Sequence, residues 1–234
     1  MKAAIIAAGW GERLRAAGFS QPKPLVPVAG KALIDYALAG VVAAGVRDVA
    51  CVVNEQSDGI EAHCHRQWPE LQFRFVRRTT PSSMESLFTL SPLLDERFVL
   101  LTVDGVFAPS TLRTFLVSTD CRTAADGILA LTTFVDDEKP LWARVAPDGH
   151  ITALGPSAHG SGLVTAGFYV FNPTIFSEIS AARRADFGAL RQFLGHLFDR
   201  RYTLYGKRVA KTVDVDRPQD IGVAEAFVRS GFKQ

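Results

Sequence analysis

The sequence predicts an α/β fold of the three-layer α/β/α type, in which helices cover both faces of a mixed, mainly parallel sheet. In the first half, short apolar runs that suit buried parallel strands alternate with segments of helical periodicity. In the middle third, strand-like runs are joined by turns such as Pro147-Asp148-Gly149, which indicates antiparallel pairing. A chain of 234 residues suits one sizeable domain. We expect a single domain at 1–234, with a core at 1–125, a small β-rich lobe at 126–172 and a return to the core at 173–234.

The first half supplies the predicted parallel strands and their crossover helices. Lys2 to Ala8 is a short apolar run that ends in glycine, as a buried strand does. Lys31 to Ala44 has apolar residues at helical spacing and ends before Gly45, a typical C-cap. The same alternation predicts further strands at 48–53, 71–76 and 98–104, and further helices at 60–67 and 84–94.

The second half predicts shorter strands before helices return. A helix opens on Pro109 and Ser110, and the runs GILALTTFV, LWARVAP, ITALG and LVTAGFYVF are predicted strands. Helical spacing returns at 173–180 and 187–198, and two short strands are expected at 202–205 and 209–213. A last helix at 218–229 has Pro218 in its first turn, where proline is tolerated.

Composition excludes several classes of partner. With 26 basic and 24 acidic residues the net charge is +2, so no overall field indicates nucleic acid or an anionic membrane. Three widely spaced cysteines argue against a disulfide framework and favour a reducing compartment, so we expect a cytoplasmic protein. The apolar run from Ala3 to Ala8 is too short for a signal sequence, and no stretch approaches the ~20 apolar residues of a membrane span.

The loop after the first strand carries residues that suit a polyphosphate. In parallel sheets ligands bind at the carboxyl ends of strands. Gly9 and Gly11 allow close approach of the backbone, and Arg13 and Lys23 supply positive charge. The G-x-G pair alone is weak, and a simple tight turn is the alternative interpretation.

The whole opening string is far more specific than its glycines. "AAGWGERL" followed by "PKPLVPVAGKALIDY" resembles the signature of the nucleotidylyltransferase (NTP transferase) family, close to AAG-x-G-x-R-[LM] and PKP-[LM]-x-P-[VIL]-x-G. The resemblance implies a Rossmann-like fold of the nucleotide-diphospho-sugar transferase type and an enzyme of EC 2.7.7 type. It implies that Arg13 and Lys23 are catalytic and that Lys23 also contacts the acceptor. The implied nucleotide-binding residues in this loop are Ala7, Ala8, Gly9 and Gly11.

Carboxylates at two strand ends suit a magnesium site. Asp104 ends the run FVLLTVD, where the family places a metal-binding Asp. "TVDVDRPQDI" resembles the family's second metal motif, which implies Asp214 and Asp216 as further Mg²⁺ ligands. A turn or capping role is the alternative for Asp104, and an N-cap is the alternative for Asp216. Asp220 is expected in the first turn of the last helix.

Two further segments bear on the base and the acceptor. "TTPSSMESLFTL" resembles the N-x-x-S-L segment of phosphocholine and inositol-phosphate cytidylyltransferases, which implies nucleotide contacts by Ser83 and Ser86; a serine-capped helix is the alternative. "VTAGFYVF" resembles the family's acceptor segment and implies contacts by Thr165 and Gly167. The "DEKP" at Asp137 to Pro140 is interpreted as a turn. "HCHR" from His63 is not expected to bind zinc, because helical side chains fan out.

These features predict transfer of NMP from an NTP to a phosphorylated small molecule, with release of pyrophosphate. CTP is favoured over UTP or GTP. The acceptor is a sugar-1-phosphate or an alcohol of the phosphocholine, inositol-phosphate or phosphonate type, and the chain is expected to be a monomer or homodimer. The alternative is a catalytically silent relative that binds nucleotides for regulation. A dinucleotide-dependent oxidoreductase is disfavoured because "GWGERL" lacks a third glycine.

Overall fold

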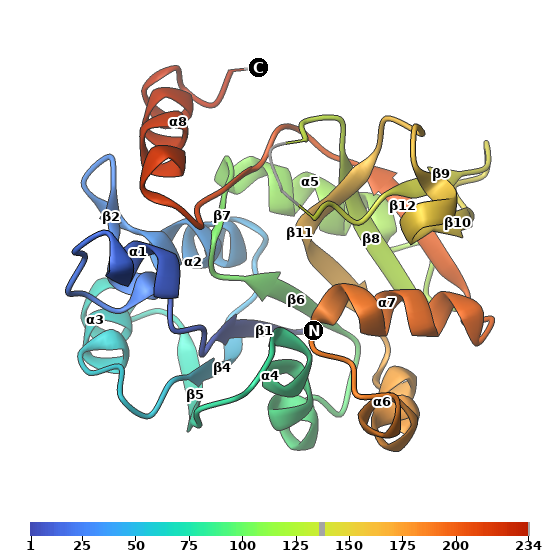
Figure 1. The fold of residues 1–234 in the computed structure, drawn as a ribbon, viewed down its shortest axis with the longest axis horizontal. Helices are drawn as coiled ribbons and strands as arrows, with labels where there is room; N and C mark the ends of the chain where they lie inside the picture. The colour runs from blue at the N-terminus through green and yellow to red at the C-terminus, as the bar shows by residue number, and fades with distance from the viewer. Residues whose placement is uncertain (136–138, 234) are drawn as a thin grey trace.

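The computed structural model describes residues 1–135 and 139–233 (Figure 1). The turn expected at Asp137 to Pro140 therefore lies in part outside the described residues. Within the described ranges, none of the helices has the length and apolar character needed to cross a bilayer.

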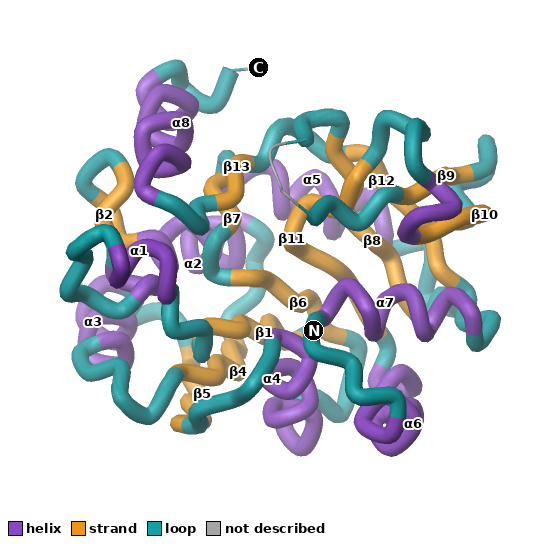
Figure 2. The backbone as a smooth tube through the Cα atoms, in the orientation of Figure 1, coloured by secondary structure: helices purple, strands orange, loops and turns teal. Residues whose placement is uncertain are grey.

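A seven-stranded mixed sheet forms the middle layer, with strand order β12-β8-β11-β6-β1-β4-β5 (Figure 2). β11 runs antiparallel to its neighbours β6 and β8, and the other neighbouring pairs are parallel. The predicted α/β class with a mixed, mainly parallel sheet is confirmed. The strands are β1 (Lys2–Ala7), β4 (Asp48–Val53), β5 (Gln72–Arg77), β6 (Phe98–Thr102), β8 (Gly127–Thr132), β11 (Val164–Phe171) and β12 (Leu204–Arg208).

Helices cover both faces of this sheet and create two cores. α2, α3 and α5 pack on one face, and α4, α6 and α7 pack on the other. Along β1, Ala3, Ile5 and Ala7 enter the first core while Ala4 and Ile6 enter the second, as the alternation of a strand requires. The α-helices are α1 (Glu12–Ala16), α2 (Leu33–Ala43), α3 (Ile60–Gln67), α4 (Ser83–Leu90), α5 (Pro109–Thr119), α6 (Ile179–Arg184), α7 (Leu190–Asp199) and α8 (Pro218–Arg229).

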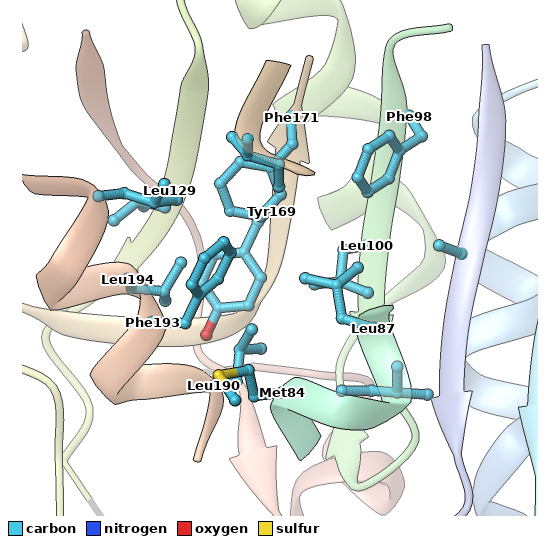
Figure 3. Close-up of a cluster of buried hydrophobic side chains, with 14 of the residues drawn as sticks. Met84, Leu87, Phe98, Leu100, Leu129, Tyr169, Phe171, Leu190, Phe193 and Leu194 are labelled. Atoms are coloured by element: carbon cyan, nitrogen blue, oxygen red, sulfur yellow. The ribbon is translucent and has the colours of Figure 1, made fainter. Parts of the chain in front are cut away.

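The core beneath α4 and α7 is rich in large side chains. Figure 3 shows Leu87 of α4 and Phe193 of α7 over Leu100 and Tyr169 of the sheet. The ring of Phe88 meets that of Phe193 edge to face, with centroids 4.9 Å apart, a favoured aromatic geometry. This packing fixes α4, whose first turn follows β5 at the carboxyl edge of the sheet.

Three small two-stranded sheets complete the fold. Among the described residues of 126–172, β8 and β11 belong to the main sheet, whereas the hairpin β9–β10 and the 3₁₀ turn Gly155–Ala158 lie beside it (Figure 1). A role for this segment in binding an acceptor stays a prediction. The small sheets pair β2 (Pro27–Val28) with β3 (Lys31–Ala32), β7 (Gly105–Val106) with β13 (Val213–Asp214), and β9 (Ala143–Val145) with β10 (Ile151–Leu154).

A hairpin shifts the start of the second helix. The predicted start at Lys31 is wrong by two residues, because Lys31–Ala32 pairs with Pro27–Val28. Ala29 and Gly30 form the two-residue turn with φ of 48° and 80°, the left-handed values that such hairpins need. The helix then begins at Leu33.

Other boundaries moved for local reasons. The helix predicted at 84–94 ends at Leu90 and continues as a 3₁₀ turn at Ser91–Leu93, since Pro92 cannot donate a helical hydrogen bond. The five-residue α1 was not predicted, because so short a segment shows no periodicity. The strand predicted at 202–205 extends to Arg208, which pairs with β8, and the strand at 209–213 shrinks to Val213–Asp214.

The three cysteines are free thiols, as the sequence predicted. Cys51 and Cys64 are buried and Cys121 is exposed. Burial raises the pKa of the Cys64 thiol to about 12, and it raises that of Cys51 well above its usual value. Since the thiolate is the reactive form, both buried groups should be inert near neutral pH.

We therefore expect Ellman's reagent to modify one thiol per native chain and all three after denaturation. A Cys121→Ser variant should give no reaction before unfolding. Modification of two or more thiols in the native protein would contradict this assignment.

Candidate active site

A cavity of about 270 Å³ opens at the carboxyl edge of the sheet, between the loops that follow β1, β5 and β6. The cavity is lined by Ile6, Ala8, Gly9, Trp10 and Glu12 at the first strand and its loop, by residues 80–83 with Ser86, and by residues 102–104 with Lys23. The larger hollows that the described residues form beside β12 and α7 contain none of the predicted site residues.

Lys23 is the buried cation of this site. It begins the 3₁₀ turn Lys23–Leu25 between Pro22 and Pro24, whose rings restrict the backbone on both sides. Its side chain is 9% exposed, and Nζ donates to Asp104 Oδ2 at 3.0 Å and to Asp216 Oδ1. Burial alone lowers the pKa of Lys23, but attraction from the two carboxylates outweighs it and raises the pKa above its ordinary value. The ammonium is therefore charged at neutral pH.

A short ladder brings the two distant carboxylate motifs together. β7 pairs antiparallel with β13, with Asp214 opposite Gly105, and the N–H of Val215 donates to the carbonyl of Asp104 at 3.0 Å. Burial pushes the pKa of Asp104 up, but the Lys23 ammonium acts against it, and the pKa ends below its usual value. Asp104 is therefore an ionised carboxylate beside the cavity.

The segment before α8 settles how Asp216 is used in this structure. Arg217 is the N-cap residue of α8, and Asp220 Oδ2 accepts the backbone N–H groups of Asp216 and Arg217 at 2.9 and 2.7 Å. The N-cap alternative for Asp216 is thus wrong, and Asp220 lies in the first turn as predicted. Asp104 does lie in a turn, but its side chain is directed to Lys23, and Ala108 is the N-cap of α5.

The carboxylates fit a divalent cation that is completed by substrate oxygens. Asp104 and Asp216 already converge on one positive group, Lys23 Nζ. Among the residues that the structure describes, no three His, Cys, Asp or Glu side chains form a metal cage. Mg²⁺ commonly uses only one or two protein carboxylates and takes its other ligands from phosphates and water. Asp214 lies nearby, with Oδ1 3.9 Å from where a Cβ on Gly105 or Gly167 would be.

The two glycines of the first loop have different environments. Gly11 has φ of +63°, and a Cβ there would lie 2.8 Å from Cβ of Lys23, so only glycine lets the loop pack on that side chain. A Cβ on Gly9 would meet no protein atom within 4 Å, which leaves space for a ligand. Arg13 is exposed on α1 and is outside the cavity lining, and Ala7 is buried in the core with α2. The roles predicted for these residues stay predictions.

The serine segment both caps a helix and lines the cavity. Ser82 Oγ accepts the N–H of Glu85 at 3.2 Å, which confirms the serine-capped alternative. Ser86 Oγ lies 2.6 Å from Thr80 Oγ1, and Ser83 Oγ accepts the N–H of Leu190 at the start of α7. Because Ser83 and Ser86 also line the cavity, their predicted contact with a nucleotide is compatible with these bonds.

The predicted acceptor residues occupy an irregular part of β11. The register with β8 shifts between Thr165 and Tyr169, and Gly167 has φ of +79° within that shift. Thr102 Oγ1, which lines the cavity, donates to the carbonyl of Gly167 at 3.2 Å. Gly167 therefore lies next to the cavity, whereas Thr165 lies outside its lining and donates its N–H to Leu141 of the neighbouring loop.

The "HCHR" segment uses its histidines for packing. His63 Nε2 lies 2.9 Å from Asp35 Oδ1, which also accepts the indole N–H of Trp68. His65 contacts two phenylalanine rings of β5 edge to face. The two imidazoles thus have different partners.

A match to a known protein family agrees with these observations. The family model described as the MobA-like NTP transferase domain matches residues 3–197 of the chain. The chain belongs to the MobA-like NTP transferase family. The predicted recognition of an NTP transferase is confirmed.

Two curated relatives of this NTP transferase are longer proteins. The CMP-5'-(3-aminopropyl)phosphonate synthase of Streptomyces rubellomurinus is 26% identical over 198 residues, which cover 76% of the chain and 29% of that protein. The bifunctional IPC transferase and DIPP synthase of Rubrobacter xylanophilus is 27% identical over 242 residues, which cover 97% of the chain and 51% of that protein. The chain thus spans about half or less of the length of these relatives.

Solved structures share the fold of this NTP transferase over nearly its whole length. The inositol-1-phosphate CTP transferase from T. maritima has a TM-score of 0.83 at 18% identity, covering 100% of the chain and 98% of that structure. A UDP-glucose pyrophosphorylase complexed with UDP-glucose has a TM-score of 0.78 at 18% identity, covering 98% of each chain. The predicted nucleotide-diphospho-sugar transferase type of fold is confirmed.

Sequence reasoning missed two polar residues of this NTP transferase. Thr102 lines the cavity and bonds to Gly167. Asn54, fully buried at the end of β4, contacts loops on both sides. An asparagine directly after an apolar strand was the available signal, since buried amides need partners.

Proposed function

We propose that this NTP transferase moves NMP from an NTP to a phosphorylated small molecule and releases pyrophosphate. The observation that carries the proposal is Lys23, buried beside a cavity at the carboxyl edge and held between Asp104 and Asp216. A silent nucleotide-binding relative would have no need of a buried cation and two carboxylates at this place.

The reaction needs no covalent enzyme intermediate. A phosphate oxygen of the acceptor attacks the α-phosphorus of the NTP in line, the bond from that phosphorus to the bridging oxygen breaks, and pyrophosphate leaves. Lys23 would stabilise charge on the α-phosphate, and Gly11 and Arg13 would bind the other phosphates. Catalysis would then be positioning and electrostatic stabilisation.

We propose Mg²⁺ as the cofactor, held by Asp104 with Asp216 or Asp214. When bound, the ion would neutralise phosphate oxygens on which charge develops. The two carboxylates that converge on Lys23 Nζ support this assignment.

We further propose CTP as the preferred donor and a phosphonate or alcohol phosphate as the acceptor. The name of the Streptomyces relative, a CMP-phosphonate synthase, supports both choices, and Ser83 and Ser86 line the cavity where the base would be read. Thr165 and Gly167 would contact the acceptor. The free thiols support a cytoplasmic location, and we retain a monomer or homodimer as the expected assembly.

Pyrophosphate release tests the proposal directly. Four NTPs are each offered with phosphocholine, aminoethylphosphonate, inositol-1-phosphate and hexose-1-phosphates in the presence of Mg²⁺. We expect turnover with at least one pair, highest with CTP, and its loss in Asp104→Ala. Absence of turnover with every pair, together with NTP binding that Asp104→Ala leaves unchanged, would favour the silent relative instead.

A further inference from the structure

Asn54 lies behind the cavity and between the two loops that form its walls. It follows β4 directly, and β4 lies between β1 and β5 in the sheet. Its side chain is fully buried and does not belong to the cavity lining. Asn54 therefore cannot contact a ligand in the cavity, but it can fix the segments that do.

The side chain joins three strand-end loops. Nδ2 donates to the carbonyl of Ala8, in the loop after β1, at 3.2 Å. Oδ1 accepts the N–H of Gln56, in its own loop, at 2.9 Å. It also lies 3.4 Å from the hydroxyl oxygen of Thr79, in the loop after β5, which shares its one proton between Asn54 and the Glu55 carboxylate at 3.1 Å. A buried amide so bonded holds all three loops at fixed separations.

An amide satisfies both kinds of backbone partner at this position. A backbone N–H at one end requires an acceptor, and a backbone carbonyl at the other end requires a donor. The ionised carboxylate of an aspartate offers two acceptors, so it would repel the Ala8 carbonyl. A serine hydroxyl has a single oxygen in place of the separate donor and acceptor atoms of the amide. The chemistry of the position thus favours asparagine.

The loops that Asn54 joins both contribute to the lining of the cavity. Ala8 and Gly9 come from the loop after β1, and Thr80, Pro81 and Ser82, directly after Thr79, come from the loop after β5. The phosphate-directed groups, Gly11 and Lys23, are not among the partners of Asn54. The effect of Asn54 should therefore fall on the nucleoside half of the site.

We propose that Asn54 is a positioning residue for the nucleotide, which sets the separation of the walls that grip its base and ribose. The proposal rests on the proposed function, because it takes an NTP as the occupant of the cavity. It adds a residue that contacts no substrate and predicts a selective loss: nucleoside recognition weakens while phosphate recognition persists.

The test compares Asn54→Asp with a control at a partly buried asparagine, Asn172→Asp. Asn172 follows β11 directly, and its Nδ2 also donates to a backbone carbonyl, that of Ala125, at 2.7 Å. It lies at the opposite edge of the sheet, because β11 is antiparallel to β6. Asn54→Ser replaces Asn54→Asp if a buried charge prevents folding.

Two probes separate the halves of the site. In both Asn54 variants we expect the Kd of CTP to rise about tenfold, the effect of losing one buried polar contact, while the Kd of inorganic tripolyphosphate stays within about twofold. Asn172→Asp should leave both values unchanged. Equal weakening of CTP and tripolyphosphate, or no weakening of either, would overturn the proposal.

Amide hydrogen exchange supplies a readout that needs no nucleotide. In the Asn54 variants, exchange in segments 8–11 and 79–83 should become faster together, and in Asn172→Asp it should not. Unchanged exchange in these segments overturns the positioning role on its own. If the wild-type protein did not bind CTP but the exchange result were as expected, the proposed function would be wrong. The role of Asn54 in holding the loops together would still stand.

Discussion

Lys23→Met is expected to lower kcat for NMP transfer by about 10²–10³-fold, the usual cost of removing one preorganised group that stabilises transition-state charge. Methionine retains much of the buried aliphatic stem, on which Gly11 packs, and removes only the ammonium. KM for the NTP should change less than kcat, since the charge on the α-phosphate grows in the transition state. Steady-state pyrophosphate release measures both constants.

The same variant leaves Asp104 and Asp216 close together without their shared cation. We expect the free energy of unfolding to fall by about 1–3 kcal/mol, less than for a fully buried pair, because the Asp216 side chain is 47% exposed. Mg²⁺ should raise the melting temperature of Lys23→Met more than that of the wild type, since the ion would replace the lost charge.

Lys207→Met is the matched control for Lys23→Met, because Lys207 is an exposed lysine of β12. It should keep kcat, the melting temperature and the Mg²⁺ response of the wild type. If Lys23→Met kept the wild-type kcat, Lys23 would have no catalytic role.

Asp104→Asn is expected to lower kcat by about 10³-fold and to raise the Mg²⁺ concentration needed for half-maximal activity by about tenfold. The amide retains the size of the side chain but loses the charge that attracts both Lys23 and a metal. Asp216→Asn should shift the Mg²⁺ requirement in the same direction. A titration of initial rate against free Mg²⁺ at saturating NTP gives both quantities.

Asp220→Asn separates metal binding from helix capping in this second motif. Asp220 accepts the backbone N–H groups of Asp216 and Arg217 at the N-terminus of α8. Its amide variant keeps an oxygen that can accept both N–H groups but loses the negative charge at the N-terminus of α8, so it should lose about 0.3–1 kcal/mol of unfolding free energy and keep the wild-type Mg²⁺ requirement. If Asp216→Asn and Asp220→Asn change the Mg²⁺ requirement by the same amount, then Asp216 affects metal binding only by supporting α8. The metal ligands would then be Asp104 and Asp214.

Elements with strong local signals were predicted closely from the sequence. The strand Asp48–Val53 and the helices Ile60–Gln67 and Pro218–Arg229 match their predicted bounds. An apolar run, a regular helical spacing and a proline at the first helical turn each act within a few residues. Such signals do not depend on the rest of the fold.

The features that escaped prediction depend on distant contacts. The strands Gly105–Val106 and Val213–Asp214 have two residues each and exist only because they pair with one another. Sequence motifs put carboxylates at strand ends, but only the folded chain shows Lys23 shared between Asp104 and Asp216. The partners of Asn54 were equally hidden, since they come from three loops.

The bond between Lys23 and Asp216 spans 193 residues, which has a consequence for biosynthesis. A ribosome makes Lys23 long before Asp216, so the Lys23 ammonium must stay solvated by water until the last segment of the chain has been made. The core around Leu14 and Val26 likewise forms only after Val215 and Phe227 have been made. Closing so long a loop is entropically costly and slow. The strand-rich centre can therefore fold first, and catalytic competence should appear only when the last segment docks.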